Sequence, residues 1–233
     1  MIYFTPDFFD FFQQLSQNNN KAWMDAHKKI FEEAVKFPFR RLVSDFLEKL
    51  YELEPTFPTQ KPEHCIFRIN RDIRFSSNKE PYKTHVAAYF CRGGKKSERP
   101  GFYIHLSAQD SFVGGGCYEL SSSNLKKIRQ QIYSCSQEFM ALVNEPSFLN
   151  TFGEIQGTKN KVLPKEYKKV AQQIPLLYNK QYYFLVSLSK EQILGQNLLE
   201  LLTSYYRIAL PILKFFENAF LIEDCSSCSD FYL

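Results

Sequence analysis

FRINRDIRFSSNKEPYKTH, residues 67–85, is where the spacing of the apolar side chains changes. Before this stretch, apolar residues recur every three or four positions, as they do on one face of a helix. Within it, Phe67, Ile69, Ile73 and Phe75 alternate with polar residues, and a period of two is typical of a strand. The stretch therefore marks the passage from a helical N-terminal part to a sheet.

The residues before the stretch predict two helical segments. Thr5 stands as N-cap before Pro6 and Asp7, a combination that favours a helix start. A second segment runs from about residue 21 to 53, and Pro38 is expected to break or restart it.

The residues after the stretch predict further strands and helices. Strands are expected near 66–75, 84–91, 102–108, 111–118 and 182–188, mainly in an antiparallel sheet. A helix is expected after residues 121–124, and a long last helix includes Pro211 as a kink. We therefore predict a single α+β domain over residues 1–233, with helices at both ends packing on the sheet and the last ten or so residues forming a flexible tail.

Composition indicates a packed globular protein. Hydrophobic residues make up 44% of the chain, and aromatic residues 16%. No apolar run approaches the roughly 20 residues that span a bilayer, and the N-terminus does not resemble a signal peptide, so we expect no membrane partner. The isolated cysteines favour a reducing, cytoplasmic location. Cys225 and Cys228 lack the context of a redox or zinc motif, and we predict neither metal nor cofactor.

Positive charge gathers around the opening stretch. The chain has a net charge of +4, but residues 61–99 contain ten Lys/Arg and four Asp/Glu, a local charge of +6. The rest of the chain has a charge of −2. Local charge decides partners better than the total, so these residues are where an anionic partner would bind.

Strand alternation would divide the arginines between two faces. Arg68 and Arg74 would share a polar face with Asp72, whereas Arg71 would lie on the apolar face. A guanidinium among apolar neighbours needs a partner, either a carboxylate or a bound anion. Asp72 between two arginines should have a lowered pKa, and would be an anion and a poor general acid at neutral pH.

The turn after the predicted strand adds further cationic groups. Asn78 favours a turn, Pro81 stiffens the chain before Tyr82, and Lys79 and Lys83 flank that proline. Arginine forks and lysine ammonium groups together suit phosphate or carboxylate ligands. We therefore predict a basic cup, built from Arg68, Arg71, Asp72, Arg74, Asn78, Lys79, Tyr82 and Lys83.

The pattern Arg68-x-x-Arg71-Asp72-x-Arg74-Phe75-x-x-Asn78-Lys79-x-x-Tyr82 resembles the signature of a bacterial family catalogued as domain of unknown function 2461. The Phe-rich first helix and the glycine-rich strand before Tyr118 are also similar. The resemblance implies a shared fold and a shared site around residues 68–83. It implies no activity.

Two other features are candidates for the same site. Gly115 and Gly116 remove side chains from a predicted strand, either for a bulge or for a floor of the basic cup. His85 and His105 could share a sheet face with Lys83, Tyr103 and Ser107, and with Asp72 they are the candidate catalytic groups.

Three functions fit these residues. The first is a binder of, or an enzyme acting on, an anionic small molecule at the basic cup. The second is a nucleic-acid or anionic-surface module that adds Arg92, Lys95, Lys96 and Arg99 as a phosphate track, with Tyr89, Phe90 and Tyr103 for stacking. The third is structural, a network of arginines and carboxylates. A concave pocket would favour the first, an exposed stripe the second, and full pairing by acidic residues the third.

Overall fold

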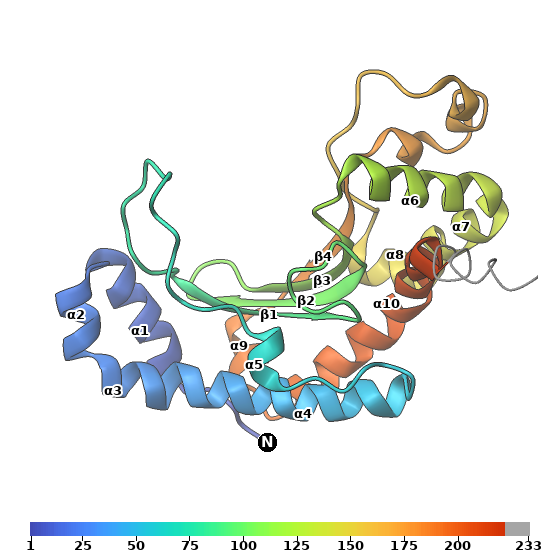
Figure 1. Ribbon diagram of the computed structural model, residues 1–233. Helices are drawn as coiled ribbons and strands as arrows, with labels where there is room; N and C mark the ends of the chain where they lie inside the picture. Colours follow the sequence, from blue (N-terminus) through green and yellow to red (C-terminus); the bar gives the residue numbers. More distant parts are fainter. Residues whose placement is uncertain (222–233) are drawn as a thin grey trace, which may run out of the picture. The chain divides into compact units, whose positions relative to one another are not determined.

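The computed structural model describes residues 1–221, so the predicted tail and Cys225 and Cys228 lie outside the described residues. Four strands form one antiparallel sheet in the order β1-β2-β3-β4 (Figure 1). They are β1 (His85–Cys91), β2 (Gly101–Ser107), β3 (Phe112–Cys117) and β4 (Tyr182–Ser187). The α+β class and these four predicted strands are confirmed. Within residues 1–221, no helix combines the length and apolarity needed to cross a bilayer.

The predicted strand near 66–75 is wrong. This segment makes two isolated bridges, Ile66 with Ala88 and Asn70 with Tyr82, and otherwise has no strand. Only its start pairs with β1; farther along, the chain turns back and pairs with itself, since the Arg71 N–H donates to the carbonyl of Pro81 over 2.8 Å. We call residues 66–84 the arm. Phe75, expected on an apolar face, is 96% exposed.

The chain divides into two compact units. Unit 1 comprises Met1–Phe90, Tyr103–Val113 and Ser187–Ser204. Unit 2 comprises Cys91–Phe102, Gly114–Val186 and the chain from Tyr205 on. The expectation of a single domain stays a prediction.

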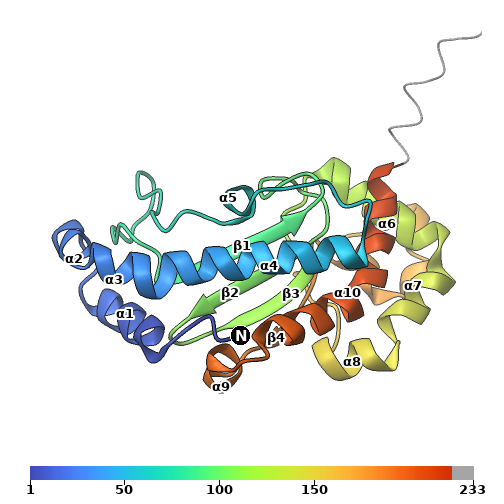
Figure 2. The same ribbon diagram turned by 90° about the horizontal axis from the view of Figure 1, so that it is seen from below.

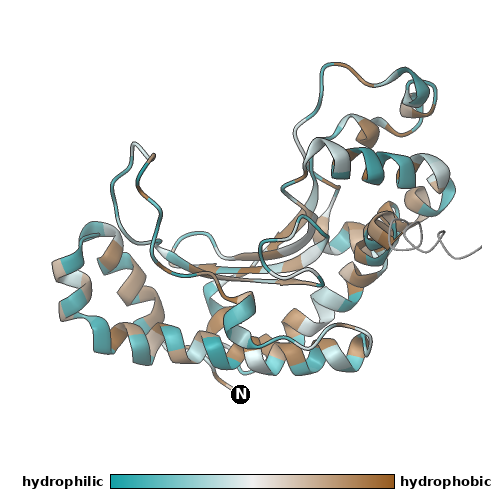
Figure 3. Ribbon diagram, viewed as in Figure 1, coloured by the Kyte–Doolittle hydropathy of each residue, from teal (hydrophilic) through white to brown (hydrophobic). Residues whose placement is uncertain are grey.

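Helices cover one face of the sheet in unit 1. α4 (Phe37–Leu53) runs across β1 and β2 (Figure 2), and the Phe46 and Phe90 rings meet at 4.7 Å. Its ribbon alternates between hydrophilic and hydrophobic residues (Figure 3), as expected for a helix with one buried face. The other helices of this unit are α1 (Pro6–Gln17), α2 (Lys21–Ala26), α3 (Lys28–Ile30), α5 (Pro62–Cys65), α9 (Lys190–Leu194) and the first part of α10, up to Ser204.

Pro38 acts at the start of α4, close to where the sequence predicted a break. A π-helical turn, η1 (Phe31–Lys36), leads directly into the helix. Because proline has no N–H, the regular ladder of hydrogen bonds cannot pass through it, and the wider turn takes up the mismatch.

The core beneath the sheet is largely aromatic and aliphatic, and includes Phe4, Phe8, Phe12, Leu15, Phe39, Leu42, Phe46 and Leu50.

Unit 2 contains the remaining helices. They are α6 (Ser122–Ser134), α7 (Ser136–Val143), α8 (Pro146–Phe152), three 3-10 turns between Lys165 and Tyr178, and the part of α10 (Leu198–Leu221) from Tyr205 on. The predicted start of α6 is confirmed: Ser121 is its N-cap and accepts from the Asn124 N–H. Its core includes the Phe102–Tyr206 and Phe148–Phe184 ring pairs.

Candidate functional site

Four rings gather on the sheet face of unit 1 that lies opposite α4. Alternation along β1 and β2 directs His85, Tyr103 and His105 to this face, as the sequence predicted for the two histidines. The His85 and His105 rings are 4.1 Å apart, and Phe112 of β3 stacks on His105 at 4.6 Å. We call His85, Tyr103, His105 and Phe112 the ring cluster.

His105 is the most enclosed polar group of the ring cluster. The residue is only 8% exposed, and its Nδ1 lies 3.5 Å from the Tyr103 hydroxyl, a long hydrogen bond. Its Nε2 is buried and has no hydrogen-bond partner among residues 1–221. Oδ1 of Asp110 lies 3.9 Å away, beyond hydrogen-bond reach. A buried nitrogen without a partner is uncommon and calls for an explanation.

Both imidazoles are poor bases in this setting. The pKa of His85 falls to about 4, first because of burial, then because of His105 and Lys83, with Asp110 acting in the opposite direction. Burial also lowers the pKa of His105, while Asp110 opposes this effect and Lys83 adds to it. Near pH 7 both rings are therefore neutral, and each offers one N–H donor and one acceptor.

Lys83 brings a positive charge to the ring cluster. It is half-buried at the end of the arm, with its Nζ 5.3 Å from the centre of the Phe67 ring. Its charge acts on both histidines. Burial raises the pKa of Tyr103 to about 12, so this hydroxyl stays protonated. An ammonium, a phenol and two neutral imidazoles therefore lie together.

Arg74 and Asp72, both predicted in the basic cup, pair with each other on the arm. The guanidinium is bidentate, with Nε and Nη2 donating to the carboxylate over 3.0 and 2.7 Å. The side-chain and backbone hydrogen bonds from Arg74 hold the pKa of Asp72 low, as does the charge of Arg68. The prediction that Asp72 is an anion at neutral pH is thus supported. Because this carboxylate is exposed and already paired with Arg74, it is poorly suited to catalysis.

The question of what neutralises Arg71 is answered by Glu80. The Nη1 of Arg71 lies 3.6 Å from the Glu80 carboxylate, and it donates to the backbone oxygen of Glu80 over 3.2 Å. The predicted apolar surroundings were wrong because the arm is not a strand, so alternation does not govern the side-chain directions.

The remaining predicted residues of the cup serve the arm itself. Asn78 donates to the Glu80 carboxylate over 2.9 Å, and Lys79 donates to the backbone oxygen of Ile73 over 3.0 Å. Tyr82 is held through its backbone by Asn19. Arg68 is exposed and has no ion pair within 4 Å in the described part of the chain. Of the predicted set, the structure brings only Lys83 to the ring cluster.

Gly115 and Gly116 belong to unit 2, where their neighbours explain them. A Cβ on Gly116 would lie 2.0 Å from the backbone oxygen of Tyr182, and its φ is +114°. A Cβ on Gly115 would lie 3.0 Å from that of Gly101. Both glycines permit neighbouring backbone to approach closely. This agrees with the structural role predicted for them, and not with a floor of the basic cup.

The predicted phosphate track also lies in unit 2, and one of its members is paired there. Arg99 Nη1 lies 2.7 Å from a carboxylate oxygen of the buried Glu217. A charge held in this way is less available to a phosphate backbone.

Sequence reasoning missed Asp110 and Phe112. Both follow β2 closely, and Asp110 is fixed by Ser107, whose hydroxyl donates to its carboxylate over 2.7 Å. A signal for Asp110 was present in the sequence. Tyr103, His105 and Ser107 are polar residues at alternate positions of a predicted strand, and the turn that follows this strand contains Asp110.

The fold and this face define an α+β protein with a candidate ligand site, in unit 1, on the face of the antiparallel sheet opposite α4. The family model described as a conserved hypothetical protein, DUF2461, matches residues 7–215, and the chain belongs to this family. No curated protein matches it.

Proposed function

We propose that this protein binds an anionic small molecule, carrying a phosphate or carboxylate group, at Lys83 and the ring cluster. One observation carries the proposal: the Nε2 of His105 is buried and lacks a hydrogen-bond partner in residues 1–221, at a place where the charge of Lys83 also acts. An unsatisfied buried polar group costs about 1–3 kcal/mol. A ligand atom at this position would remove that cost.

The hydrogen-bond directions favour a ligand that accepts. The Tyr103 hydroxyl stays protonated and lies 3.5 Å from Nδ1 of His105. In the tautomer that we propose, the hydroxyl donates and Nδ1 accepts. Nε2 then carries the proton and can donate to a ligand oxygen. With the Lys83 ammonium, the site offers two donors for one anionic group.

The arm supports this arrangement through its own bonds. The Lys83 N–H donates to the backbone oxygen of Ile69 over 2.8 Å, and Arg71 and Glu80 pair farther along. These bonds limit the positions open to Lys83. Arg71 thus acts as a positioning residue in this proposal.

Binding of a single-stranded nucleic acid is the second candidate. Partly exposed aromatic rings lie on the same face: Phe67 and Tyr103 are 6.3 Å apart, and Tyr89 and Tyr103 are 6.5 Å apart. Bases stack on such rings, at about 1–3 kcal/mol per base. The pairing of Arg99 with Glu217 weighs against a long phosphate track.

Calorimetry with a panel of anions tests the proposal. Inorganic phosphate, sulfate, citrate and adenosine monophosphate are titrated into wild type and Lys83→Met, and short oligonucleotides are titrated at low and raised salt. We expect at least one small anion to bind, and Lys83→Met to weaken it about tenfold or more, because a hydrogen bond to a charged group contributes about 1.5–3 kcal/mol.

Lys79→Met is the matched control, because Lys79 is also on the arm but donates to a backbone oxygen of that segment. It should leave the affinity within about twofold. Equal losses in both variants, or no anion binding to wild type, would contradict the proposal. Salt-sensitive binding of oligonucleotides alone would favour the second candidate.

We also propose a cytoplasmic location. The Cys65 and Cys91 thiols donate hydrogen bonds to the Gln60 side chain and to the backbone oxygen of Arg99, and burial raises the pKa of the Cys91 and Cys117 thiols. Such thiols suit a reducing compartment. Fluorescence microscopy of a tagged chain tests this, and a periplasmic or extracellular signal would contradict it.

A further inference from the structure

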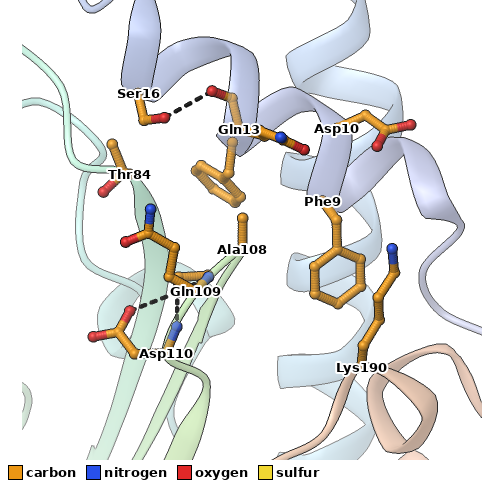
Figure 4. Close-up of a pocket in the computed structure, with 11 residues that line it drawn as sticks. Phe9, Asp10, Gln13, Ser16, Thr84, Ala108, Gln109, Asp110 and Lys190 are labelled. Carbon is orange, nitrogen blue, oxygen red and sulfur yellow. Dashed lines mark hydrogen bonds between the residues drawn. The ribbon is translucent and has the colours of Figure 1, made fainter.

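A cavity of about 300 Å³ lies within unit 1, between α1 and the turn that joins β2 to β3. Figure 4 shows Phe9 and Gln13 of α1 across from Gln109 of the turn, while the Asp110 carboxylate is directed away from the space between them. That carboxylate accepts instead from the Ser107 hydroxyl, over 2.7 Å. The charged side chains that line the cavity point in different directions, so the cavity by itself indicates no ligand.

Positive charge, by contrast, is concentrated in unit 2. Up to Leu221 this unit contains 15 Lys/Arg and seven Asp/Glu, a charge of +8, whereas unit 1 contains 14 Lys/Arg and 15 Asp/Glu, a charge of −1. Two segments of unit 2, α6 and residues 155–181, together contain nine Lys/Arg and one Asp/Glu. These two segments therefore account for the whole excess of unit 2.

Side-chain contacts hold the two segments together. The Arg129 guanidinium of α6 donates to the Leu177 carbonyl over 2.9 Å and to the Asn179 carbonyl over 3.1 Å. The Tyr167 hydroxyl donates to Oε1 of Gln130 over 3.2 Å, and Figure 1 shows the second segment beside α6. Arg129 is buried and bonded to backbone, so the positive charge left on the surface of these segments belongs to lysines.

Seven lysines of the two segments are exposed, and we call them the lysine surface. They are Lys126, Lys159, Lys161, Lys165, Lys168, Lys169 and Lys180. Within residues 1–221, none of the seven has an ion pair closer than 4 Å. The lysine surface therefore has charges that no carboxylate of the described chain neutralises.

Backbone pairing brings distant members of the lysine surface together. Lys159 and Asn179 form an antiparallel bridge, and the Lys180 N–H donates to the Thr158 carbonyl over 2.7 Å. Lys159 and Lys180 therefore lie next to each other along this pairing, and Lys161 follows two residues later.

A 3-10 turn places other members beside α6. The turn η2 (Lys165–Tyr167) begins with one lysine of the surface and is followed directly by Lys168. Its Tyr167 is buried and donates to Gln130, and Lys126 lies four residues before Gln130 on α6. Residues four apart share one face of a helix, so Lys126 is on the face of α6 that this turn contacts.

The lysine surface lacks the acidic neighbours that lysines of unit 1 have. There, Lys29, Lys36 and Lys49 each pair with a glutamate three or four residues away on the same helical segment. The one acid of the two basic segments, Glu166, is exposed and pairs with no lysine of residues 1–221. Like charges repel one another and disfavour the compact state, and a bound polyanion would offset that repulsion.

We propose that the lysine surface binds the phosphate backbone of a double-stranded nucleic acid, without regard to base sequence. Phosphate contacts from lysine position a protein on a duplex but carry no sequence information. The Arg129 fork, which could read a base edge, is bound to backbone carbonyls. Of the aromatic residues in these two segments, which the structure describes in full, Tyr133 alone is exposed, at 39%. One ring is a poor platform for the unpaired bases of a single strand.

Fluorescence anisotropy with short labelled duplexes of DNA and of RNA, each in two unrelated sequences, tests the proposal. We expect at least one of the two kinds of duplex to bind, with affinities for its two sequences within about threefold. Affinity should fall about a hundredfold between 50 and 200 mM salt, the dependence expected for about four phosphate contacts.

Replacing three members of the lysine surface should weaken duplex binding. In the triple variant Lys165→Gln/Lys168→Gln/Lys169→Gln, we expect a loss of about tenfold or more at low salt. The slope of the salt dependence should also fall by about two to three, because each lost phosphate contact removes about one. Thermal unfolding checks that the variant is folded.

The matched control is the triple variant Lys21→Gln/Lys28→Gln/Lys29→Gln. These three lysines are exposed in unit 1, and their replacement removes the same charge from the chain. The control should change duplex affinity less than about twofold. Equal losses in the two triple variants would show a general effect of net charge and would contradict the proposal.

Three further outcomes would overturn the proposal. The first is no binding of either duplex to wild type, including the case in which only vesicles of phosphatidylglycerol and phosphatidylcholine are bound. The second is a single strand that binds as tightly as the duplex. The third is a loss of duplex binding in Lys83→Met but not in the triple variant of the lysine surface, which would place the nucleic acid on the arm.

The inference does not rest on the proposed anion site, and the two fail separately. Lys83→Met should weaken the small anion and leave duplex affinity unchanged. The triple variant of the lysine surface should weaken the duplex and leave the affinity for the small anion unchanged. Loss of both ligands in either variant would contradict the assignment of two separate sites.

Discussion

Asn19 holds the backbone of Tyr82 through both polar atoms of its side chain. Its Nδ2 donates to the Tyr82 carbonyl over 2.9 Å, and its Oδ1 accepts from the Tyr82 N–H over 3.1 Å. Asn19 lies between α1 and α2, whereas Tyr82 is next to Lys83 at the end of the arm. One side chain therefore fastens the arm to the N-terminal helices.

Asn19→Ala should weaken both the fold and the anion site. Two hydrogen bonds are lost at a part-buried position, and we expect the free energy of unfolding to fall by about 1–3 kcal/mol, measured by urea denaturation. Anion affinity should also fall, because Lys83 is no longer held. Gln17→Ala, an exposed change at the end of α1, should stay within about 0.5 kcal/mol. A stability loss no larger than that of the control would show that the clamp is not formed.

The protein should lose stability as the pH falls from 6.5 towards 4. Unfolded His85 binds a proton near pH 6.5, but folded His85 does so only near pH 4, so the unfolded state binds more protons in this window. Since the ring is partly exposed, we expect about 1–2 kcal/mol between pH 7 and pH 4.5. Urea denaturation at these pH values measures it, and His85→Gln should reduce the difference.

The groups that face His85 are His105, Lys83 and Asp110, and each of them enters this balance. An NMR titration of the folded protein follows the His85 ring directly. A midpoint above pH 6 would show that the ring is not desolvated as described.

Gly116→Ala should damage the fold of unit 2. Its φ of +114° disfavours any side chain, and a Cβ would collide with the Tyr182 backbone oxygen. We expect a loss of about 3 kcal/mol or more by chemical denaturation, or no folded protein. Gly153 also has positive φ, +69°, but its Cβ would meet nothing within 4 Å. Gly153→Ala should therefore cost only the backbone strain, about 1–3 kcal/mol, and less than Gly116→Ala. Equal costs in the two variants would disprove close strand approach at Gly116.

The sequence predicted the four strands because alternation and turn residues are local signals. The same alternation was misleading at Ile73 and Phe75, because the pairing partner of the arm is the returning chain that contains Pro81. A strand needs a neighbour along its length, and the arm has one only at isolated bridges. Alternation by itself could not show this.

The candidate site was predictable only in part. His85 and His105 could be placed on one face because they lie in predicted strands, and Lys83 precedes them closely. Asp110 was not predictable, since an aspartate in a turn is common and its nearness to His105 depends on the turn geometry. The cavity was even harder to predict, because its walls come from α1, the β2–β3 turn and α9, which lie far apart in the sequence.

The sheet order has a consequence for the chain during its synthesis. β1, β2 and β3 leave the ribosome one after another, but β4 follows only after residues 118–181. At about 5–20 residues per second, the free edge of β3 waits roughly 3–13 s for its neighbour. An unpaired edge is a template for aggregation, and glycine has a low propensity to form strands. Until β4 arrives, Gly114, Gly115 and Gly116 should therefore lower the tendency of this edge to pair with other nascent chains.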